Sequence, residues 1–254
     1  HLSIRRQRQM CIRDRGMIDK TLHFIIGHEG FKTLGCGRTD SKVSADDFAF
    51  ELFLNESFKT DDLLNRLNKE LPSDIRTKSV EVVDAEFNII QHSKIKEYHY
   101  YFSSGKKSHP FNAPLIRDFG KQLNIELMQQ AVQLFMGTHN FKRYASKPSD
   151  NTIFERDILL SVIEKNTRFV DAYNPSDAYV FKVRSKGFLR YQVRLMVGAL
   201  VDVGRGLWSI EDLKESLSNY EGMQVRHIAP SSGLILHRVE SVSYTHLTLP
   251  TNRE

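Results

Sequence analysis

Residues 34–45 read LGCGRTDSKVSA, and residues 187–206 read GFLRYQVRLMVGALVDVGRG. The first stretch places Gly35 and Gly37 close together, and a loop rich in glycine can bring its backbone near a ligand because glycine carries no Cβ. Asp40 follows at the entrance to an expected strand. The second stretch predicts a strongly apolar, largely buried helix. A Gly-Arg-Thr-Asp tetrapeptide alone is most often a turn with a surface Arg–Asp pair.

Around these stretches the sequence alternates between helical and strand periodicity, which predicts an α+β fold. Helices are expected at residues 18–27, 63–71, 125–137, 188–203 and 212–217. Strands are expected at residues 48–54, 80–87, 94–102, 154–163, 178–185 and 233–239. A Thr60-Asp61 pair is the expected cap of the second helix. Residues 105–114 are rich in Gly, Lys, Ser and Pro and predict the loop between two halves.

Length and composition exclude several classes of protein. The chain has 254 residues, enough for one large domain or two small ones. It contains no apolar stretch of about 18 or more residues, so no membrane-spanning helix is expected. The two cysteines, Cys11 and Cys36, cannot build a disulfide framework and fit no zinc signature. These features predict a cytoplasmic protein without membrane association.

The two ends differ from the rest of the sequence. Residues 1–16 are rich in arginine without apolar periodicity, and residues 243–254 do not continue the preceding strand pattern. Both resemble translated sequencing-adapter read-through, so we expect a non-native leader and tail; a basic RNA-binding arm and a natural tail are the alternative. The leader holds five arginines against one aspartate and supplies +4 of the net charge of +5. The overall charge therefore does not by itself indicate a nucleic-acid partner.

Five segments resemble, in order, the motifs of the TruA family of tRNA pseudouridine synthases. They are Gly37–Asp40, Lys96-x-Tyr98-x-Tyr100, Phe135-x-Gly137-Thr138-His139-Asn140-Phe141, Gly187–Gly206 and Pro230-x-x-Gly233-Leu234. The resemblance covers residues 17–242. It implies two related ferredoxin-like or RRM-like halves, residues 17–108 and 109–242, whose strands form one continuous antiparallel sheet. Helices would cover the outer face, and a catalytic cleft would lie between the halves.

The resemblance also implies roles for individual residues. Asp40 falls on the catalytic aspartate, whose ionised carboxylate attacks the target nucleotide. Arg194 matches the basic residue that pairs with this aspartate, and a nearby cation favours the charged form of a carboxylate. Tyr98 matches the tyrosine that stacks on the target base once the base has left its helix. The residues expected to contact RNA are Arg38, Thr39, Lys96, Lys142 and Arg143.

Each of these roles has a structural alternative. Tyr98 could simply be one of several strand aromatics, and Arg194 a helix arginine that reaches solvent. Arg38 could form a surface ion pair worth about 0–1 kcal/mol, while Lys142 and Arg143 could belong to a solvated loop. The histidines show no metal-ligand spacing, and the resemblance implies neither a metal nor an organic cofactor.

The implied function is the isomerisation of uridine to pseudouridine in the anticodon stem-loop of tRNA, by a homodimer in which one tRNA spans both subunits. One alternative is a catalytically impaired RNA-binding module of the same fold, and another is a uridine-nucleotide enzyme unrelated to RNA. The presence of Asp40, Tyr98 and Arg194 together favours the synthase, because a carboxylate repels phosphate and does not serve a pure RNA binder.

Two features depart from the family pattern. After the aspartate the family carries a glycine and a histidine where this chain has Lys42 and Ser44, which indicates a divergent branch. A Tyr-Asp-Gly strand and a following Gly-Trp-Gln segment, with which the family normally begins, have no counterpart before Ile18. We therefore expect an unpaired strand edge, lower stability and poor activity compared with a relative that carries this strand.

Overall fold

The computed structural model describes residues 9–37, 40, 42–55, 58–84, 86–105, 109–120, 123–169 and 177–241. Its α-helices are α2 (Gln9–Ile26), α3 (Thr60–Glu70), α4 (Ile89–His92), α5 (Ile125–Val132), α6 (Gln192–Gly204) and α7 (Ile210–Ser218). Three single turns of 3₁₀-helix are η1 (Pro110–Asn112), η2 (Gln133–Phe135) and η3 (Lys142–Tyr144). The strands are β1 (Phe31–Gly35), β2 (Ser44–Ala45), β3 (Phe50–Leu54), β4 (Ser93–Ser103), β5 (Arg117–Asp118), β6 (Gly137–Asn140), β7 (Glu155–Lys165), β8 (Ala178–Ser185) and β9 (Leu234–Ser241).

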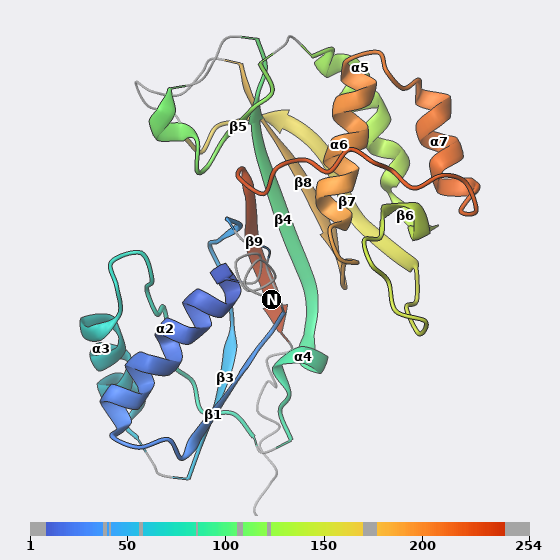
Figure 1. The fold of residues 1–254 in the computed structure, drawn as a ribbon. Coiled ribbons are helices and arrows are strands. Elements are labelled where there is room, and N and C mark those ends of the chain that lie inside the picture. The colour runs from blue at the N-terminus through green and yellow to red at the C-terminus, as the bar shows by residue number, and fades with distance from the viewer. Residues whose placement is uncertain are drawn as a thin grey trace, which may run out of the picture.

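The described strands form two sheets (Figure 1). The large sheet has the order β2-β9-β4-β8-β7-β6, and β5 pairs with the end of β4. Its long strands are antiparallel, whereas the short pairs β2–β9 and β4–β5 are parallel. β1 and β3 form a separate antiparallel pair.

The expectation of one continuous antiparallel sheet is therefore wrong for the described residues. Beyond Gly35 the chain leaves its ladder with β3 after one further hydrogen bond, from the Cys36 N–H to the Ala49 carbonyl. It then turns through the Asp40 loop, so that β2 joins the large sheet beside β9 instead of extending the β1–β3 pair. The division into two related halves at residue 108 stays a prediction.

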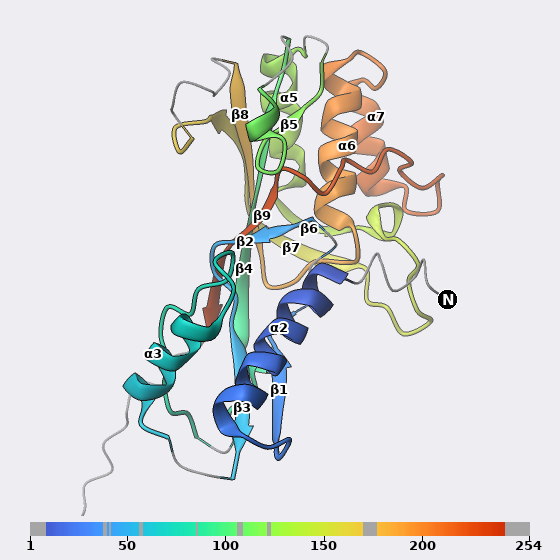
Figure 2. The ribbon, with the colours of Figure 1, turned by 60° about the vertical axis from the view of Figure 1, so that its left-hand side comes forward.

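Helices cover the two sheets separately. α5, α6 and α7 lie together on one face of the large sheet, while α2 and α3 lie beside β1 and β3 (Figures 1 and 2). Because successive side chains of a strand point to opposite faces, β4 contributes to two environments. Tyr98, Tyr100 and Phe102 pack in or against the main core under the helices, and Tyr101 belongs to a smaller cluster.

α6 is the central helix of the main core, with 11 of its 13 residues buried. This confirms the expected buried helix, but the helix begins at Gln192 and not near Phe188. Tyr191 has a φ of 64°, in the left-handed region that a right-handed helix cannot include. Within the helix, Gly198 allows the backbone at His227 to approach closely, since a Cβ would lie 1.8 Å from the His227 carbonyl oxygen.

A second core joins α2 and α3 to the β1–β3 pair. Its buried residues are Leu22, Ile25, Leu63, Leu67 and Leu71. α2 begins at Gln9, upstream of the boundary expected at residue 16, and the Arg15 guanidinium donates to the Thr33 carbonyl over 2.6 Å. The non-native origin of the leader stays a prediction.

Two smaller expectations about local structure are wrong. The strand expected at residues 80–87 is irregular where it is described, and Val82 is 86% exposed, so this segment has no buried face that would support a strand. α3 begins at Thr60 with Lys59 as its N-cap and has no side-chain capping bond, so the expected Thr60-Asp61 cap is not formed. Among the described helices, none combines the length and apolarity required to cross a membrane.

Candidate active site

The loop that carries Asp40 is anchored at both ends. Upstream, Cys36 is buried and its N–H donates to the Ala49 carbonyl over 2.9 Å. Downstream, the Val43 N–H donates to the Asp40 carbonyl over 3.2 Å, and the Val43 side chain lies in the main core. β2 then pairs with Ile235 and Leu236 of β9. These anchors hold Asp40 between the two sheets at a defined place.

Asp40 and Arg194 form an ion pair. The Arg194 Nη1 atom donates to Asp40 Oδ2 over 2.9 Å, although the two residues are 154 positions apart in the sequence. The Arg194 side chain is only 15% exposed, whereas the Asp40 side chain is 29% exposed. The carboxylate is therefore paired with a cation and still accessible from solvent.

Arg194 is held by three further contacts. Its Nε atom donates to the Ala229 carbonyl over 2.7 Å, and its own carbonyl accepts from the Ala229 N–H over 3.0 Å. Its guanidinium lies 4.7 Å from the centre of the Tyr191 ring, within the range of a cation–π contact. Tyr191 is the residue with left-handed backbone, and such strain persists where the surrounding structure fixes it. The guanidinium thus has one defined orientation toward Asp40.

Tyr98 of β4 lies beside the segment that leads into α6, the helix that carries Arg194. It pairs with Val183 of β8 and Leu236 of β9, and its ring meets the Phe188 ring edge-on at 5.4 Å and 85°. The β4–β9 register shifts between Glu97 and Tyr98, and such bulges re-aim side chains beside functional sites. Since Phe188 belongs to the segment that leads into α6, Tyr98 and Arg194 are positioned by the same stretch of chain.

Tyr100 fixes a neighbouring part of the site. Its hydroxyl donates to the Pro230 carbonyl over 2.9 Å. Burial raises the pKa of Tyr100, so that its phenol stays protonated and serves as a donor. Together with Arg194 and its contact to Ala229, this bond holds residues 229–230 against the sheet and α6.

The other described residues that were expected to contact RNA lie in different parts of the structure. Lys96 lies on β4 two positions before Tyr98, and its ammonium donates to the Cys36 carbonyl over 2.7 Å. Lys142 and Arg143 lie on η3, where Lys142 contacts Glu221 over 2.8 Å and Arg143 donates to the Met223 carbonyl over 2.6 Å. The structure therefore groups these two with the segment after α7 and not with Asp40. Arg38 and Thr39 lie outside the described residues.

Three structural contributors had not been assigned to the site from the sequence. They are Tyr191, Phe188 and the backbone of Ala229. The periodicity of the sequence assigned Tyr191 and Phe188 to the buried face of the helix and not to a site. The contact of Ala229 is made by its main chain, so its side chain could not indicate it. Two signals pointed to this region: a glycine inside an apolar helix, at Gly198, and the motif that begins at Pro230.

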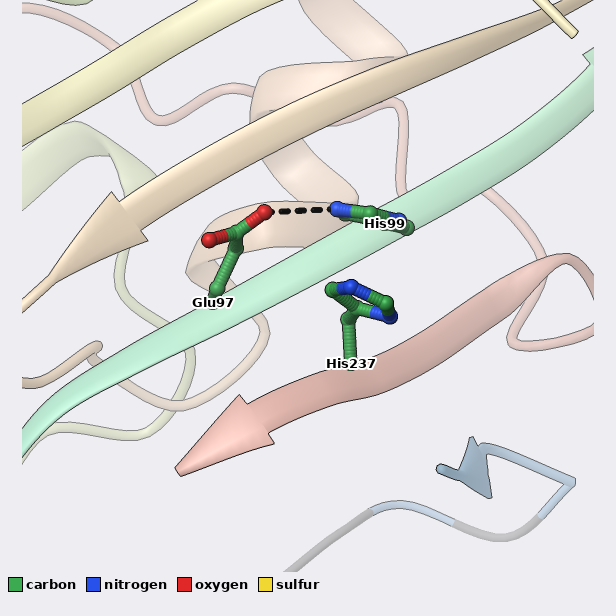
Figure 3. A group of neighbouring side chains, drawn as sticks. All are labelled: Glu97, His99 and His237. Carbon is green, nitrogen blue, oxygen red and sulfur yellow. Dashed lines mark hydrogen bonds and ion pairs between the residues drawn. The ribbon is translucent and has the colours of Figure 1, made fainter. Parts of the chain in front are cut away.

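The opposite face of the sheet carries a polar cluster, with Glu97 and His99 on β4 and His237 on the neighbouring strand β9 (Figure 3). One ligand-type atom of each lies within 4.8 Å of the others. His99 Nε2 is 2.7 Å from Glu97 Oε1, and the two imidazole rings stack with their centres 3.9 Å apart and their planes 17° from parallel. Stacked rings direct their nitrogen lone pairs along nearly parallel planes, so the two imidazoles do not converge on one ion.

Neighbouring groups connect this cluster to the strand that follows the Asp40 loop. His237 Nδ1 lies 3.0 Å from Asp46 Oδ2, and Asp46 also accepts two hydrogen bonds from Arg168. Burial disfavours ionisation of Asp46, but the hydrogen bonds from Arg168 and His237 outweigh it and lower the pKa of Asp46. Burial lowers the pKa of His99. The cluster is thus a hydrogen-bonded network that ties β2 to β4 and β9, and not a preformed metal site.

Comparison with known proteins finds similarity to tRNA pseudouridine synthases. The sequence profile of a family described as "tRNA pseudouridine synthase" matches residues 131–240. A tRNA pseudouridine synthase A of Fervidobacterium nodosum is 32% identical over 208 residues, which cover 82% of this chain and 81% of the relative. One of Clostridium botulinum (strain Eklund 17B) is 30% identical over 234 residues, 91% of this chain and 92% of the relative. A tRNA pseudouridine synthase A 2 of Bacillus thuringiensis subsp. konkukian is 28% identical over 226 residues, 89% of this chain and 88% of the relative.

Proposed function

Because the chain belongs to the TruA family of tRNA pseudouridine synthases, we propose that Asp40 is the carboxylate that catalyses the isomerisation of uridine to pseudouridine in tRNA. The observation that carries this proposal is the ion pair between Asp40 and Arg194. The Arg194 side chain is mostly shielded from solvent and is held by Ala229 and Tyr191, so the direction of its guanidinium is fixed before substrate binds. A carboxylate held in this way has a fixed orientation and is still accessible from solvent, as a covalent catalyst requires.

The reaction moves one bond and leaves the atomic composition of the nucleotide unchanged. The glycosidic bond between N1 of uracil and C1′ of the ribose breaks, and a bond between C5 and C1′ forms. C5 loses a proton and N1 gains one. Asp40 attacks the target nucleotide, at the sugar or at the base, and holds the intermediate while the base turns. Arg194 holds the carboxylate in its orientation.

The remaining residues act on the RNA. Tyr98 stacks on the extruded base and takes part in proton movement, and its place beside Phe188 supports this role. Arg38 and Thr39 hold the nucleotide out of its stack, and Lys142 and Arg143 contact the RNA backbone further away. The substrate region is the anticodon stem-loop.

We also propose that the protein is a homodimer in which one tRNA spans both subunits, as the resemblance of its motifs to this family implies. Multi-angle light scattering of the purified protein measures the mass directly. Twice the mass of the 29.4 kDa chain is expected, and the mass of a single chain at micromolar concentration would contradict the proposal.

The role of Asp40 is tested by replacing it with asparagine, which keeps the shape but removes the charge. Pseudouridine formation on unmodified tRNA should be abolished in Asp40→Asn, while tRNA binding measured by filter retention is kept. Asp150→Asn is a matched control, because Asp150 is also a loop aspartate but is exposed and lies outside the site. Binding without pseudouridine formation by the unaltered protein would instead favour an RNA-binding module.

A further inference from the structure

We propose that Lys96 is a positioning residue for the Asp40 loop and not a contact for RNA. The Lys96 ammonium donates to the carbonyl of Cys36 over 2.7 Å, four residues before Asp40. It also lies against Gly37, where an added Cβ would meet Lys96 Nζ at 3.0 Å. The inference rests on the proposed role of Asp40 and adds the side chain that holds the upstream end of its loop.

The strand register explains why β4 supplies this support. Lys96 is opposite Ser185 of β8, and Tyr98 is opposite Val183, so the two side chains project from the same face of β4. Tyr98 packs against Phe188 in the segment that leads into α6, and Arg194 reaches Asp40 from that helix. Lys96 therefore fixes the distance between the loop and the strand that carries Tyr98. The downstream end of the loop has its own anchors in Val43 and the β2–β9 pair.

The surroundings of Lys96 favour this contact over an ion pair with the neighbouring thiol. Burial raises the pKa of the Cys36 thiol, which keeps it neutral. A neutral buried thiol offers no negative charge to an ammonium group, whereas a backbone carbonyl is a good acceptor. A hydrogen bond from a charged donor is also stronger than a neutral one. The carbonyl of Cys36 is thus the natural partner, and the bond constrains the loop backbone directly.

The test compares Lys96→Met, Lys96→Arg and the control Lys94→Met, which removes an exposed lysine from the same strand. Single-turnover rates at saturating tRNA, and tRNA affinity as a function of salt, are measured for each. For Lys96→Met we expect a rate about 10- to 100-fold lower, as for the loss of a charge-assisted hydrogen bond. Its affinity and salt dependence should stay those of the unaltered protein, and Lys96→Arg should recover most of the rate.

Two outcomes overturn the inference. One is a Lys96→Met rate within about twofold of the unaltered protein. The other is weaker tRNA binding with a salt slope reduced by about one, the signature of a lost phosphate contact. If Lys96→Met does not fold, Lys96→Gln, which keeps an uncharged donor, undergoes the same comparison. Full activity in Asp40→Asn would refute the proposed catalytic aspartate, whereas a fully active Lys96→Met beside an inactive Asp40→Asn refutes only the role of Lys96.

Discussion

The guanidinium of Arg194 makes two hydrogen bonds in different directions, to the Asp40 carboxylate and to the Ala229 carbonyl. A planar guanidinium can satisfy both at once, but an ammonium group is a single point donor at the end of a flexible stem. The identity of this residue therefore matters beyond its positive charge.

Arg194→Lys should lower the rate of pseudouridine formation about 10- to 100-fold, because one hydrogen bond to a charged group is lost and such bonds contribute roughly 1.5–3 kcal/mol. The affinity for tRNA should change little. The rate is measured at saturating tRNA, and Arg226→Lys, at an exposed arginine, is the matched control. A rate for Arg194→Lys equal to that of the control would show that charge alone is sufficient.

The sequence identified Asp40, Arg194 and Tyr98 as a set because each lies in a segment that resembles a family motif. The structure places Asp40 and Arg194 in contact across 154 positions. The contacts of Lys96 and Ala229 could not be predicted in this way, because both involve backbone carbonyl groups. Whether a lysine reaches a carbonyl or solvent depends on the path of a loop 60 residues away.

α6 and the segment at residues 227–229 act as one unit in the site. The absence of a side chain at Gly198 lets the His227 carbonyl approach the helix, and His227 also contacts Asp202 of α6 over 2.8 Å. The same close approach places the Ala229 carbonyl beside Arg194. Packing at Gly198 therefore affects the orientation of the Asp40–Arg194 ion pair, since Arg194 lies one helical turn away.

Gly198→Ala should destabilise the protein and reduce its activity, since the new Cβ would lie 1.8 Å from the His227 carbonyl oxygen. Overpacking of this kind typically costs about 1–3 kcal/mol, and each kcal/mol lowers the Tm by roughly 2–4 °C at this size. Thermal melts and rates are compared with Gly187→Ala, because a Cβ at Gly187 meets nothing within 4 Å. Equal Tm values for the two variants would disprove the close approach.

Periodicity predicted most elements but not their ends. The buried stripe of α6 and the alternation in β4, β7, β8 and β9 are strong signals because these elements pack against a large core. The failure at residues 80–87 has the opposite cause, since a run with strand-like residues forms no strand without a partner. The start of α6 was not predicted because a tyrosine gives no sequence signal for the left-handed backbone that Tyr191 adopts.

The arrangement of the two sheets was the hardest feature to foresee. β2 is two residues long, and β1 and β3 pair with each other and not with the large sheet. Pairings between such short strands depend on the loops that connect them and not on residue patterns. The sequence therefore predicted the α+β class, whereas the separation of the sheets required the structure.

Stability should depend on pH through the buried His99, which is surrounded by Glu97 of β4, Lys182 of β8 and His237 of β9. Burial lowers the pKa of His99 below its ordinary value of 6.5. At pH values between 6.5 and this lower pKa, the unfolded chain binds more protons than the folded one. The free energy of unfolding therefore falls as pH falls through this interval. Asp46, whose pKa is lowered from 3.8, loses its contribution only in more acidic solution.

Urea unfolding at pH 7.5, 6.5 and 5.5 checks this dependence. The unaltered protein should lose stability across the interval, and His99→Gln, which cannot be protonated there, should lose less. His23→Gln, at an exposed histidine, is the control, and its free energy of unfolding should change with pH as much as that of the unaltered protein. Identical slopes for His99→Gln and the unaltered protein would assign the dependence to other groups.

The most direct measurement is the mapping of pseudouridine in an unmodified tRNA transcript after incubation with the protein, with Asp40→Asn run in parallel. The account predicts pseudouridine at uridines of the anticodon stem-loop with the unaltered protein, and none with Asp40→Asn although that variant binds the transcript equally well. Pseudouridine formed by both proteins, or by neither while both bind tRNA, would contradict the assignment of Asp40 as the catalytic carboxylate.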